Sequence, residues 1–205
     1  MVRVLCLGDS LTSGVTKKGS EFPYSTVLAK KLGSGAVVRN EGYGGTQATE
    51  MPIRLDKILA ASRQGFDAVV ILGGTNDLRA GAQAEEIISA LLYCAEASHK
   101  HGAMAFVCTV PEMKTEEICG RGDRIREQRL LLNDSLLQEL PMISGHCIDL
   151  ASQFPMDLPP DDRAEFWSDD VHPTARGYRA FGEFIAHRLL QVLPKVASQP
   201  TQRAH

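Results

Sequence analysis

The sequence has no apolar run long enough to cross a membrane, and we expect no signal peptide within it, unless a leader was removed before residue 1. A spanning helix needs roughly 20 consecutive apolar residues, whereas a candidate core strand already begins at Val2. We therefore expect a cytoplasmic protein without stable membrane association.

A block of basic residues is also missing. The 22 Lys and Arg residues are spread along the chain, and the formal net charge is -3. This distribution gives no electrostatic footprint for nucleic acid or for an anionic membrane surface. We expect a small-molecule partner and one folded domain over residues 1–194, followed by a mobile tail at 195–205.

The cysteines lack the spacing of a disulfide framework or a zinc site. They are odd in number, none forms a C-x-x-C pair, and most lie in apolar segments. We therefore expect reduced thiols in the core, with neither a disulfide framework nor a zinc site. No cofactor is expected either. The five are Cys6, Cys94, Cys108, Cys119 and Cys147.

Short apolar runs alternate with segments of helical periodicity along the whole chain. The runs lie at residues 2–7, 36–40, 68–72, 103–110 and 146–150. The helical segments lie at about 23–32, 46–63, 84–99, 124–140 and 173–194. This alternation predicts a three-layer α/β/α domain with a five-stranded parallel sheet. The proline-rich segment 151–168 is predicted to be a surface loop with little regular structure.

Polar or glycine-rich segments follow the first three strands. In a flavodoxin-like strand order, 2-1-3-4-5, the carboxyl ends of these strands lie side by side and form the binding crevice. They would bring together Ser10, Gly45 and Asn76. A serine hydroxyl becomes a good nucleophile only when a base removes its proton, so a reactive Ser10 needs a histidine partner.

His172 is the best-placed histidine, because it precedes the last helical segment and Asp169 lies three residues before it. That carboxylate could fix the tautomer of the ring. The same cluster is also typical of a helix cap, with Asp170 as a capping or solvated acid. Similarly, Asn76 could form an Asx-turn and residues 42–45 a plain glycine-rich turn. These alternatives stay open on the pattern alone.

Acyl transfer needs donors for the developing oxyanion. The candidates are the backbone N–H groups of Ser10 and Gly45, with Gly44 as the alternative to Gly45, and the side chain of Asn76. A glycine is suitable because it lets a ligand approach the backbone closely.

Four blocks, in order, resemble the GDSL, or SGNH, hydrolase superfamily. They are Gly8-Asp9-Ser10-Leu11, the glycine turn ending at Gly45, Gly73-Gly74-Thr75-Asn76-Asp77, and Asp169-Asp170-Val171-His172-Pro173. The resemblance implies a flavodoxin-like sheet and hydrolysis of esters or thioesters through an acyl-enzyme, without metal. It also implies that Ser10 is the nucleophile, His172 the base and Asp169 its orienting acid, with an oxyanion hole formed by Ser10, Gly45 and Asn76.

The resemblance indicates a reaction more clearly than a substrate, because such hydrolases act on acyl glycerides, lysophospholipids, acetylated sugars and aryl esters. Since no long lid segment is visible, we expect short acyl groups. A lysophospholipase, a thioesterase-type acylhydrolase and a carbohydrate acetylesterase are the alternatives. Candidate substrate-binding residues are Asp9, Leu11, Thr75, Phe166, Trp167 and Val171.

The connections 15–24, 111–123 and 154–167 are expected to set substrate choice. Apolar side chains of the last connection could line an acyl pocket or simply fasten a long loop to the core. An alternative of another class is a flavodoxin-like module that holds FMN or phosphate after the first strand. That alternative leaves the pairing of Asp169 with His172 unexplained.

Overall fold

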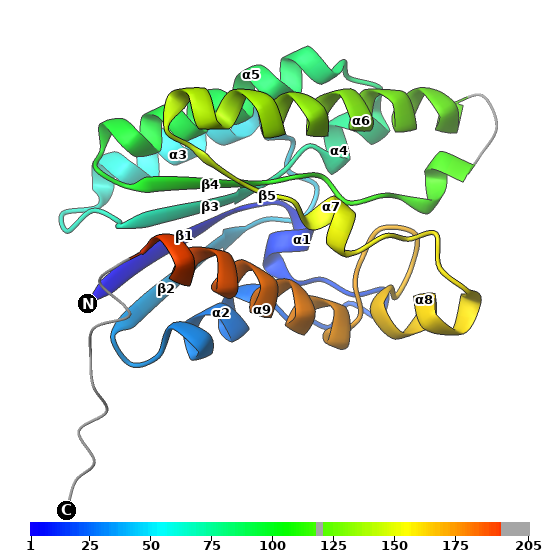
Figure 1. Ribbon diagram of the computed structural model, residues 1–205, viewed down its shortest axis with the longest axis horizontal. Coiled ribbons are helices and arrows are strands. Elements are labelled where there is room, and N and C mark those ends of the chain that lie inside the picture. The colour runs from blue at the N-terminus through cyan, green and yellow to red at the C-terminus, as the bar shows by residue number, and fades with distance from the viewer. Residues whose placement is uncertain (118–120, 194–205) are drawn as a thin grey trace, which may run out of the picture.

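The fold is a five-stranded parallel sheet with helices on both faces (Figure 1). This computed structural model describes residues 1–117 and 121–193. The predicted mobile tail and Cys119 lie outside these ranges. The strand order is β2-β1-β3-β4-β5, as predicted. The strands are β1 (Val2–Gly8), β2 (Ala36–Gly42), β3 (Ala68–Leu72), β4 (Met104–Cys108) and β5 (His146–Ile148).

The central strands are apolar because both of their faces are covered. Every residue of β3 is buried, and β1 has only Arg3 partly exposed. Such nearly continuous apolar runs are typical of parallel strands between two helical layers. By contrast, β2 lies at the edge of the sheet and has only half-buried and exposed positions, which alternate in its first part.

Strand register aligns the carboxyl ends of β1, β2 and β3. Gly8 at the end of β1 pairs with Gly42 on one side and with Leu72 on the other. The segments that follow these three residues therefore leave the sheet at the same edge. Ser10, Gly45 and Asn76 all lie within four residues of these strand ends.

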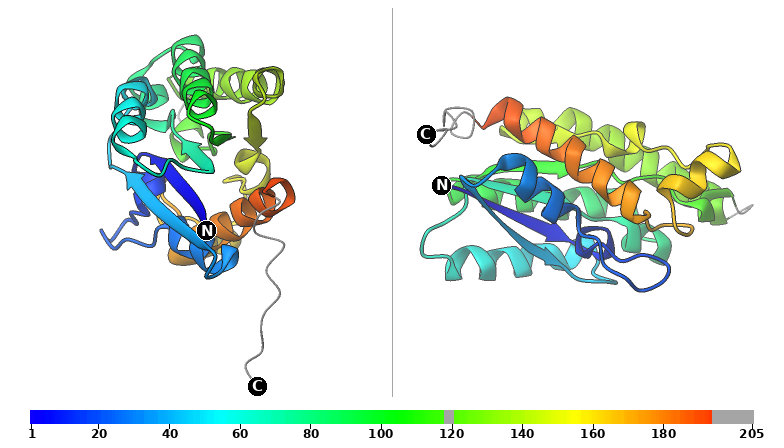
Figure 2. Two further views of the ribbon diagram at one scale, coloured as in Figure 1. Left: turned by 90° about the vertical axis from the view of Figure 1, so that its left-hand side faces the viewer. Right: turned by 90° about the horizontal axis from the view of Figure 1, so that it is seen from below.

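Two helical layers enclose the sheet (Figure 1, Figure 2). One contains α2 (Tyr24–Leu32) and α9 (Ala175–Val192), and the other contains α3 (Met51–Ala61), α5 (Ala84–Lys100) and α6 (Arg121–Glu139). Pro52 lies in the first turn of α3, where the missing N–H costs nothing. The Thr174 hydroxyl caps α9 by accepting a hydrogen bond from the Gly177 N–H at 3.1 Å.

The prediction of an irregular loop over 151–168 is wrong. This region contains most of α7 (Leu150–Gln153) and all of α8 (Pro160–Phe166). The Asp149 side chain caps α7, and Pro160 occupies the first turn of α8. Proline at this position favours a helix start, because its φ angle is already helical. The prolines that suggested an irregular loop therefore include one that begins a helix.

Other short elements were not predicted. They are α1 (Ser10–Ser13), α4 (Thr75–Ala80), η2 (Lys114–Glu117) and η3 (Leu140–Ile143). The predicted helical segment at 46–63 consists of η1 (Ala48–Glu50) followed by α3. The fifth strand is also shorter than predicted, since it ends at Ile148. Because α1 and α4 begin directly behind strands, Ser10 and Asn76 lie in first helical turns rather than in loops.

Three cysteines, Cys6, Cys94 and Cys108, are buried, and Cys147 is partly buried. Burial raises the pKa of the Cys6 and Cys94 thiols to about 12, so both are protonated core side chains at neutral pH. Within residues 1–117 and 121–193, none of the helices combines the length and apolar character that crossing a membrane requires.

Candidate active site

Ser10, His172 and Asp169 form one continuous hydrogen-bonded chain. His172 Nε2 lies 3.0 Å from Ser10 Oγ, although 162 positions separate the two residues in the sequence. His172 Nδ1 lies 2.9 Å from Asp169 Oδ2. The His172 and Asp169 side chains are 22% and 26% exposed, so the pair is accessible to a ligand without being fully solvated.

The Asp169 carboxylate is fixed by its own backbone turn. Its Oδ1 accepts hydrogen bonds from the N–H groups of Val171 at 2.8 Å and His172 at 2.7 Å. Partial burial acts to raise the pKa of Asp169, but these bonds and the one from the imidazole outweigh it and lower the pKa. The carboxylate is therefore ionised at neutral pH and accepts the Nδ1 proton of His172, which leaves Nε2 free to act as an acceptor toward Ser10.

Contacts from both sides hold the segment that carries Asp169 and His172. Trp167 and Pro173 form an antiparallel bridge at its base. The backbone N–H of Lys17 donates to Ser168 Oγ at 3.0 Å, and the N–H of Lys114 donates to the Asp170 carbonyl, also at 3.0 Å. The Asp170 side chain is exposed, in keeping with a solvated acid.

Ser10 is placed by a tight turn from β1 into α1. Asp9 caps the helix, because its Oδ1 accepts the Leu11 N–H at 2.8 Å. A Cβ atom on Gly8 would come within 2.4 Å of the Leu72 carbonyl oxygen, and one on Gly42 within 2.2 Å of the Ser13 nitrogen. These two glycines therefore allow α1 to lie directly against the neighbouring strand ends.

Asp9 is a buried carboxyl group with one unpaired oxygen. It is fully buried, and its Oδ2 has no hydrogen-bond partner in the described part of the chain. Burial, with a smaller contribution from the charge of Asp77, raises the pKa of Asp9 to about 7, against the lowering effect of the Leu11 N–H. Asp9 is therefore a buried helix cap that supports the turn between β1 and α1.

Residues 43–46 form a turn that faces the same strand edge. The Thr46 N–H donates to the Tyr43 carbonyl at 3.2 Å, and Gly45 has a φ of +80° at the third position. That position of a type II turn requires a positive φ, which glycine adopts without strain. Neither the Gly44 nor the Gly45 N–H has an acceptor among residues 1–117 and 121–193, so both are available to a ligand.

Asn76 connects this turn to α4. It is the second residue of α4, and its Nδ2 donates to the Thr46 carbonyl at 2.9 Å. The helix begins after Gly74, whose φ of +117° turns the chain out of β3. Asn76 is thus oriented by a neighbouring segment and not only by its own backbone.

Most of the predicted substrate-binding side chains contact protein. Besides Asp9, the buried ones are Leu11, Thr75, Trp167 and Val171. Trp167 Nε1 donates to the Pro155 carbonyl at 3.2 Å, and its ring packs edge-on against Phe181. The partly exposed Phe166 lies 5.2 Å from the Arg176 guanidinium. Their part in substrate binding stays a prediction, since contacts with protein do not test it.

Two residues next to the site were missed from the sequence. Ser168 Oγ donates to the His172 carbonyl at 3.0 Å, and Arg54 contacts the carbonyl oxygens of Gly8 and Glu41. Ser168 directly precedes the block from Asp169 to Pro173, and this position could have indicated that it lies at the site. Arg54 belongs to no motif and lies on an ordinary amphipathic helix, so no sequence feature indicated its position.

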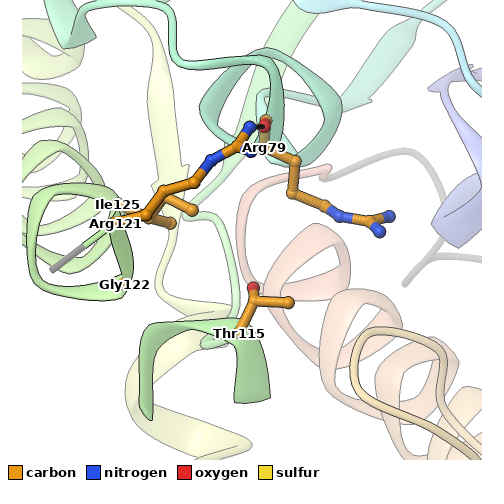
Figure 3. Close-up of a pocket in the computed structure, with 5 residues that line it drawn as sticks. All are labelled: Arg79, Thr115, Arg121, Gly122 and Ile125. Atoms are coloured by element: carbon orange, nitrogen blue, oxygen red, sulfur yellow. Dashed lines mark hydrogen bonds between the residues drawn. The ribbon is translucent and has the colours of Figure 1, made fainter. Parts of the chain in front are cut away.

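A cavity of about 210 Å³ lies between α4, η2 and the start of α6 (Figure 3). It is lined by Arg79, Thr115, Arg121, Gly122 and Ile125. Arg121 Nη2 donates to the Arg79 carbonyl at 2.6 Å. Arg79 follows Asn76 by three residues on α4, but neither Asn76 nor Ser10, Asp169 or His172 lines the cavity. Within the part of the chain that the structure describes, no three His, Cys, Asp or Glu side chains are grouped to hold a metal ion.

Solved structures share this fold at low sequence identity. An arylesterase candidate from Agrobacterium tumefaciens is 23% identical, with a TM-score of 0.75 over 94% of this chain and 100% of that one. The M. smegmatis aryl esterase is 21% identical, with a TM-score of 0.74 over 94% and 100%. A carbohydrate acetylesterase family member from Sinorhizobium meliloti is 21% identical, with a TM-score of 0.74 over 93% and 98%.

A search among curated proteins finds no significant match to the sequence. The profile of the GDSL-like lipase/acylhydrolase family, in contrast, matches residues 6–180, from the middle of β1 into α9. The matched region contains Ser10, Gly45, Asn76, Asp169 and His172. The chain therefore belongs to the GDSL-like lipase/acylhydrolase family.

Proposed function

We propose that the protein is a serine carboxylic ester hydrolase that cleaves esters of short acyl chains through an acyl-enzyme intermediate. The observation that carries this proposal is the hydrogen-bonded chain from Ser10 Oγ through the His172 ring to the Asp169 carboxylate. Each member has the chemical property that its role requires, namely a hydroxyl, a titratable base and an anion that orients the base.

In the first half of the reaction, His172 Nε2 accepts the Ser10 proton as Oγ attacks the ester carbonyl carbon. Asp169 Oδ2 accepts a hydrogen bond from His172 Nδ1 at 2.9 Å, so Nε2 presents its lone pair to the hydroxyl. The same carboxylate stabilises the imidazolium that forms. The imidazolium then protonates the leaving alcohol oxygen, and the acyl group stays on Ser10.

Three donors are available for the oxyanion, namely the N–H groups of Ser10 and Gly45 and the Asn76 side chain. The Asn76 amide has two N–H bonds, and the Thr46 carbonyl uses one of them. The second N–H has no acceptor within residues 1–117 and 121–193, so it can serve the oxyanion. Gly45 is favoured over Gly44 because it occupies the positive-φ position that shapes the turn. In the second half, water attacks the acyl carbon and His172 accepts its proton. His172 then returns a proton to Ser10 Oγ as the carboxylic acid leaves.

The preference for short acyl groups has two supports. The segment over 154–167 packs onto the protein through buried Met156 and Trp167, and it forms no long lid. In addition, one structural relative is described as a carbohydrate acetylesterase family member and another as an aryl esterase. Acetyl is the shortest common acyl group, and a short chain needs no extended apolar channel.

The test is a series of p-nitrophenyl esters from acetate to laurate, assayed with the wild type and with Ser10→Ala. We expect the acetate to be cleaved fastest, and Ser10→Ala to lose at least about a thousandfold in kcat. Equal rates for the wild type and Ser10→Ala would refute the proposal, and fastest cleavage of laurate would contradict the short-chain preference. Acetylated sugars and lysophospholipids then separate the acetylesterase from the lysophospholipase alternative.

The FMN or phosphate module remains the alternative of another class. It would use the loop after β1 but would leave the bond between Asp169 and His172 without a purpose. A yellow chromophore in the purified protein would support that alternative over ester hydrolysis.

A further inference from the structure

Arg54 lies on α3 and reaches the carboxyl ends of β1 and β2. Its Nη2 donates to the Glu41 carbonyl at 2.8 Å, in the last part of β2. Its Nη1 lies 3.4 Å from the Gly8 carbonyl at the end of β1 and 3.3 Å from Thr46 Oγ1. One guanidinium group therefore joins the end of β1 to the end of β2 and to the turn that follows β2.

Two of these contacts, those with Gly8 and Thr46, lead to the proposed oxyanion donors. Gly8 is two residues before Ser10, and Thr46 directly follows Gly45. The Thr46 carbonyl also accepts the hydrogen bond from Asn76 at 2.9 Å. We propose that Arg54 is a positioning residue that holds the three oxyanion donors in register, an inference that rests on the proposed ester hydrolysis at Ser10.

The turn at residues 43–46 needs such a support because its glycines have no packing. A Cβ atom on Gly44 or on Gly45 would meet nothing within 4 Å. Glycine also has the largest backbone freedom, so an unpacked glycine pair does not hold an N–H group in one direction by itself. Besides Arg54, the turn is tied by the Tyr43 N–H to the Gly8 carbonyl at 3.1 Å and by Asn76.

Arg54 also clamps the turn through Tyr43. The centre of its guanidinium lies 4.5 Å from the middle of the Tyr43 ring, a cation–π distance. The Tyr43 hydroxyl donates to Glu41 Oε2 at 3.1 Å, although the residue is 56% exposed. The first residue of the turn is thus in contact with Arg54, although its ring is also exposed to solvent.

The shape of the guanidinium matters as much as its charge. Two of its acceptors are backbone carbonyls and the third is a hydroxyl, and no carboxylate in the described ranges forms an ion pair with it. A planar fork of five N–H groups serves several acceptors in fixed directions, whereas a lysine ammonium is a single point on a flexible stem. Lysine therefore does not replace arginine here.

Arg3 provides a matched control at the opposite end of the sheet. Its Nε donates to the Gly65 carbonyl at 2.9 Å and its Nη1 to Gln64 Oε1 at 2.7 Å. Its guanidinium lies 5.8 Å from the centre of the Phe66 ring. Arg3 and Arg54 thus make the same kinds of contact, but only Arg54 makes them beside Ser10.

The experiment compares Arg54→Ala, Arg54→Lys and Arg3→Ala in p-nitrophenyl acetate hydrolysis, with thermal unfolding of each. We expect Arg54→Ala to lose about 10- to 100-fold in kcat with KM within about twofold, because a slight misplacement of catalytic groups is that costly. The kcat of Arg54→Lys should stay as low as that of Arg54→Ala. Arg3→Ala should keep the kcat of the wild type, although its Tm falls about as much as that of Arg54→Ala. A kcat for Arg54→Ala equal to that of Arg3→Ala overturns the proposal, and so does full activity of Arg54→Lys.

Chemical rescue gives a readout that a merely stabilising role would not change. Guanidinium chloride at low millimolar concentration should restore part of the kcat of Arg54→Ala but not that of Asn76→Ala, with sodium chloride at equal concentration as control. Arg54→Gln takes the place of Arg54→Ala if the alanine variant does not fold. Absence of rescue in a folded variant speaks against positioning by the guanidinium fork.

A measurement without substrate separates this inference from the proposed function. Arg54→Ala should shift or broaden the backbone amide resonances of Gly44 and Gly45 in a ¹⁵N spectrum, while Arg3→Ala leaves them in place. If the wild type hydrolyses no ester, the proposed function fails, and the spectra still decide whether Arg54 orders the turn. Unmoved glycine resonances in Arg54→Ala refute the positioning role.

Discussion

The Asn76 side chain donates a hydrogen bond of 2.9 Å to the Thr46 carbonyl, joining the start of α4 to the turn that follows β2. This bond fixes the plane of the amide before any ligand arrives. An oxyanion donor is most effective when it needs no reorganisation during the reaction. The relationship therefore gives Asn76 a preorganised second N–H.

Asn76→Ala should lower kcat about 10- to 1000-fold, the usual range for loss of one oxyanion donor. Asn76→Asp keeps the shape but removes the donors and adds a negative charge, so it should be at least as impaired. Steady-state hydrolysis of p-nitrophenyl acetate measures both. Unchanged kcat in both variants would exclude Asn76 from the oxyanion hole.

Asp169→Asn should lower kcat by about 10³- to 10⁴-fold, because an amide favours the wrong tautomer of His172 and cannot stabilise an imidazolium. The Asn oxygen can still accept the N–H groups of Val171 and His172, so Tm should change little. Asp170→Asn is the control, since that side chain is exposed. Equal activity of the two variants would contradict the proposed role of Asp169.

Asp9 should make the protein less stable as the pH rises. Its pKa is raised to about 7 in the folded state, above its value in the unfolded chain of about 4. The folded state therefore keeps the proton to higher pH, and the free energy of unfolding falls between about pH 4 and pH 7. Asp9→Asn removes this ionisation and can still cap α1.

The gain in Tm of Asp9→Asn over the wild type should therefore be larger above pH 7 than near pH 4. Thermal unfolding of both proteins across this range measures it. A difference that does not change with pH would show that Asp9 is not the group responsible.

Arg129→Met should destabilise the fold by about 3–5 kcal/mol, because it leaves a buried carboxylate unpaired. Arg129 Nε and Nη2 bind the two carboxylate oxygens of Glu116 at 2.7 and 2.9 Å. The two side chains are only 7% and 1% exposed. In urea unfolding, adding Glu116→Gln to Arg129→Met should recover part of the loss, whereas additive losses would argue against this pairing as the cause.

Local sequence patterns predicted the sheet because burial on both faces demands long apolar runs. The runs at β1 and β3 are buried almost throughout, so their sequence carries a strong signal. The short helices α1 and α4 gave no such signal, because helices of one or two turns lack a periodic face. They form here because the strands and neighbouring loops hold their ends.

The sequence by itself determined which groups are available for chemistry and in what order they occur. Ser10, Asp169 and His172 could be named from residue type, spacing and the strand ends they follow. Their hydrogen-bonded chain could not, since it joins residues 162 positions apart. Likewise, burial of Asp9 and the reach of Arg54 across three segments depend on how helices pack at the sheet edge. Hydrophobic period is a local property of the chain, whereas contacts between distant segments exist only once strand register and crossovers have placed them.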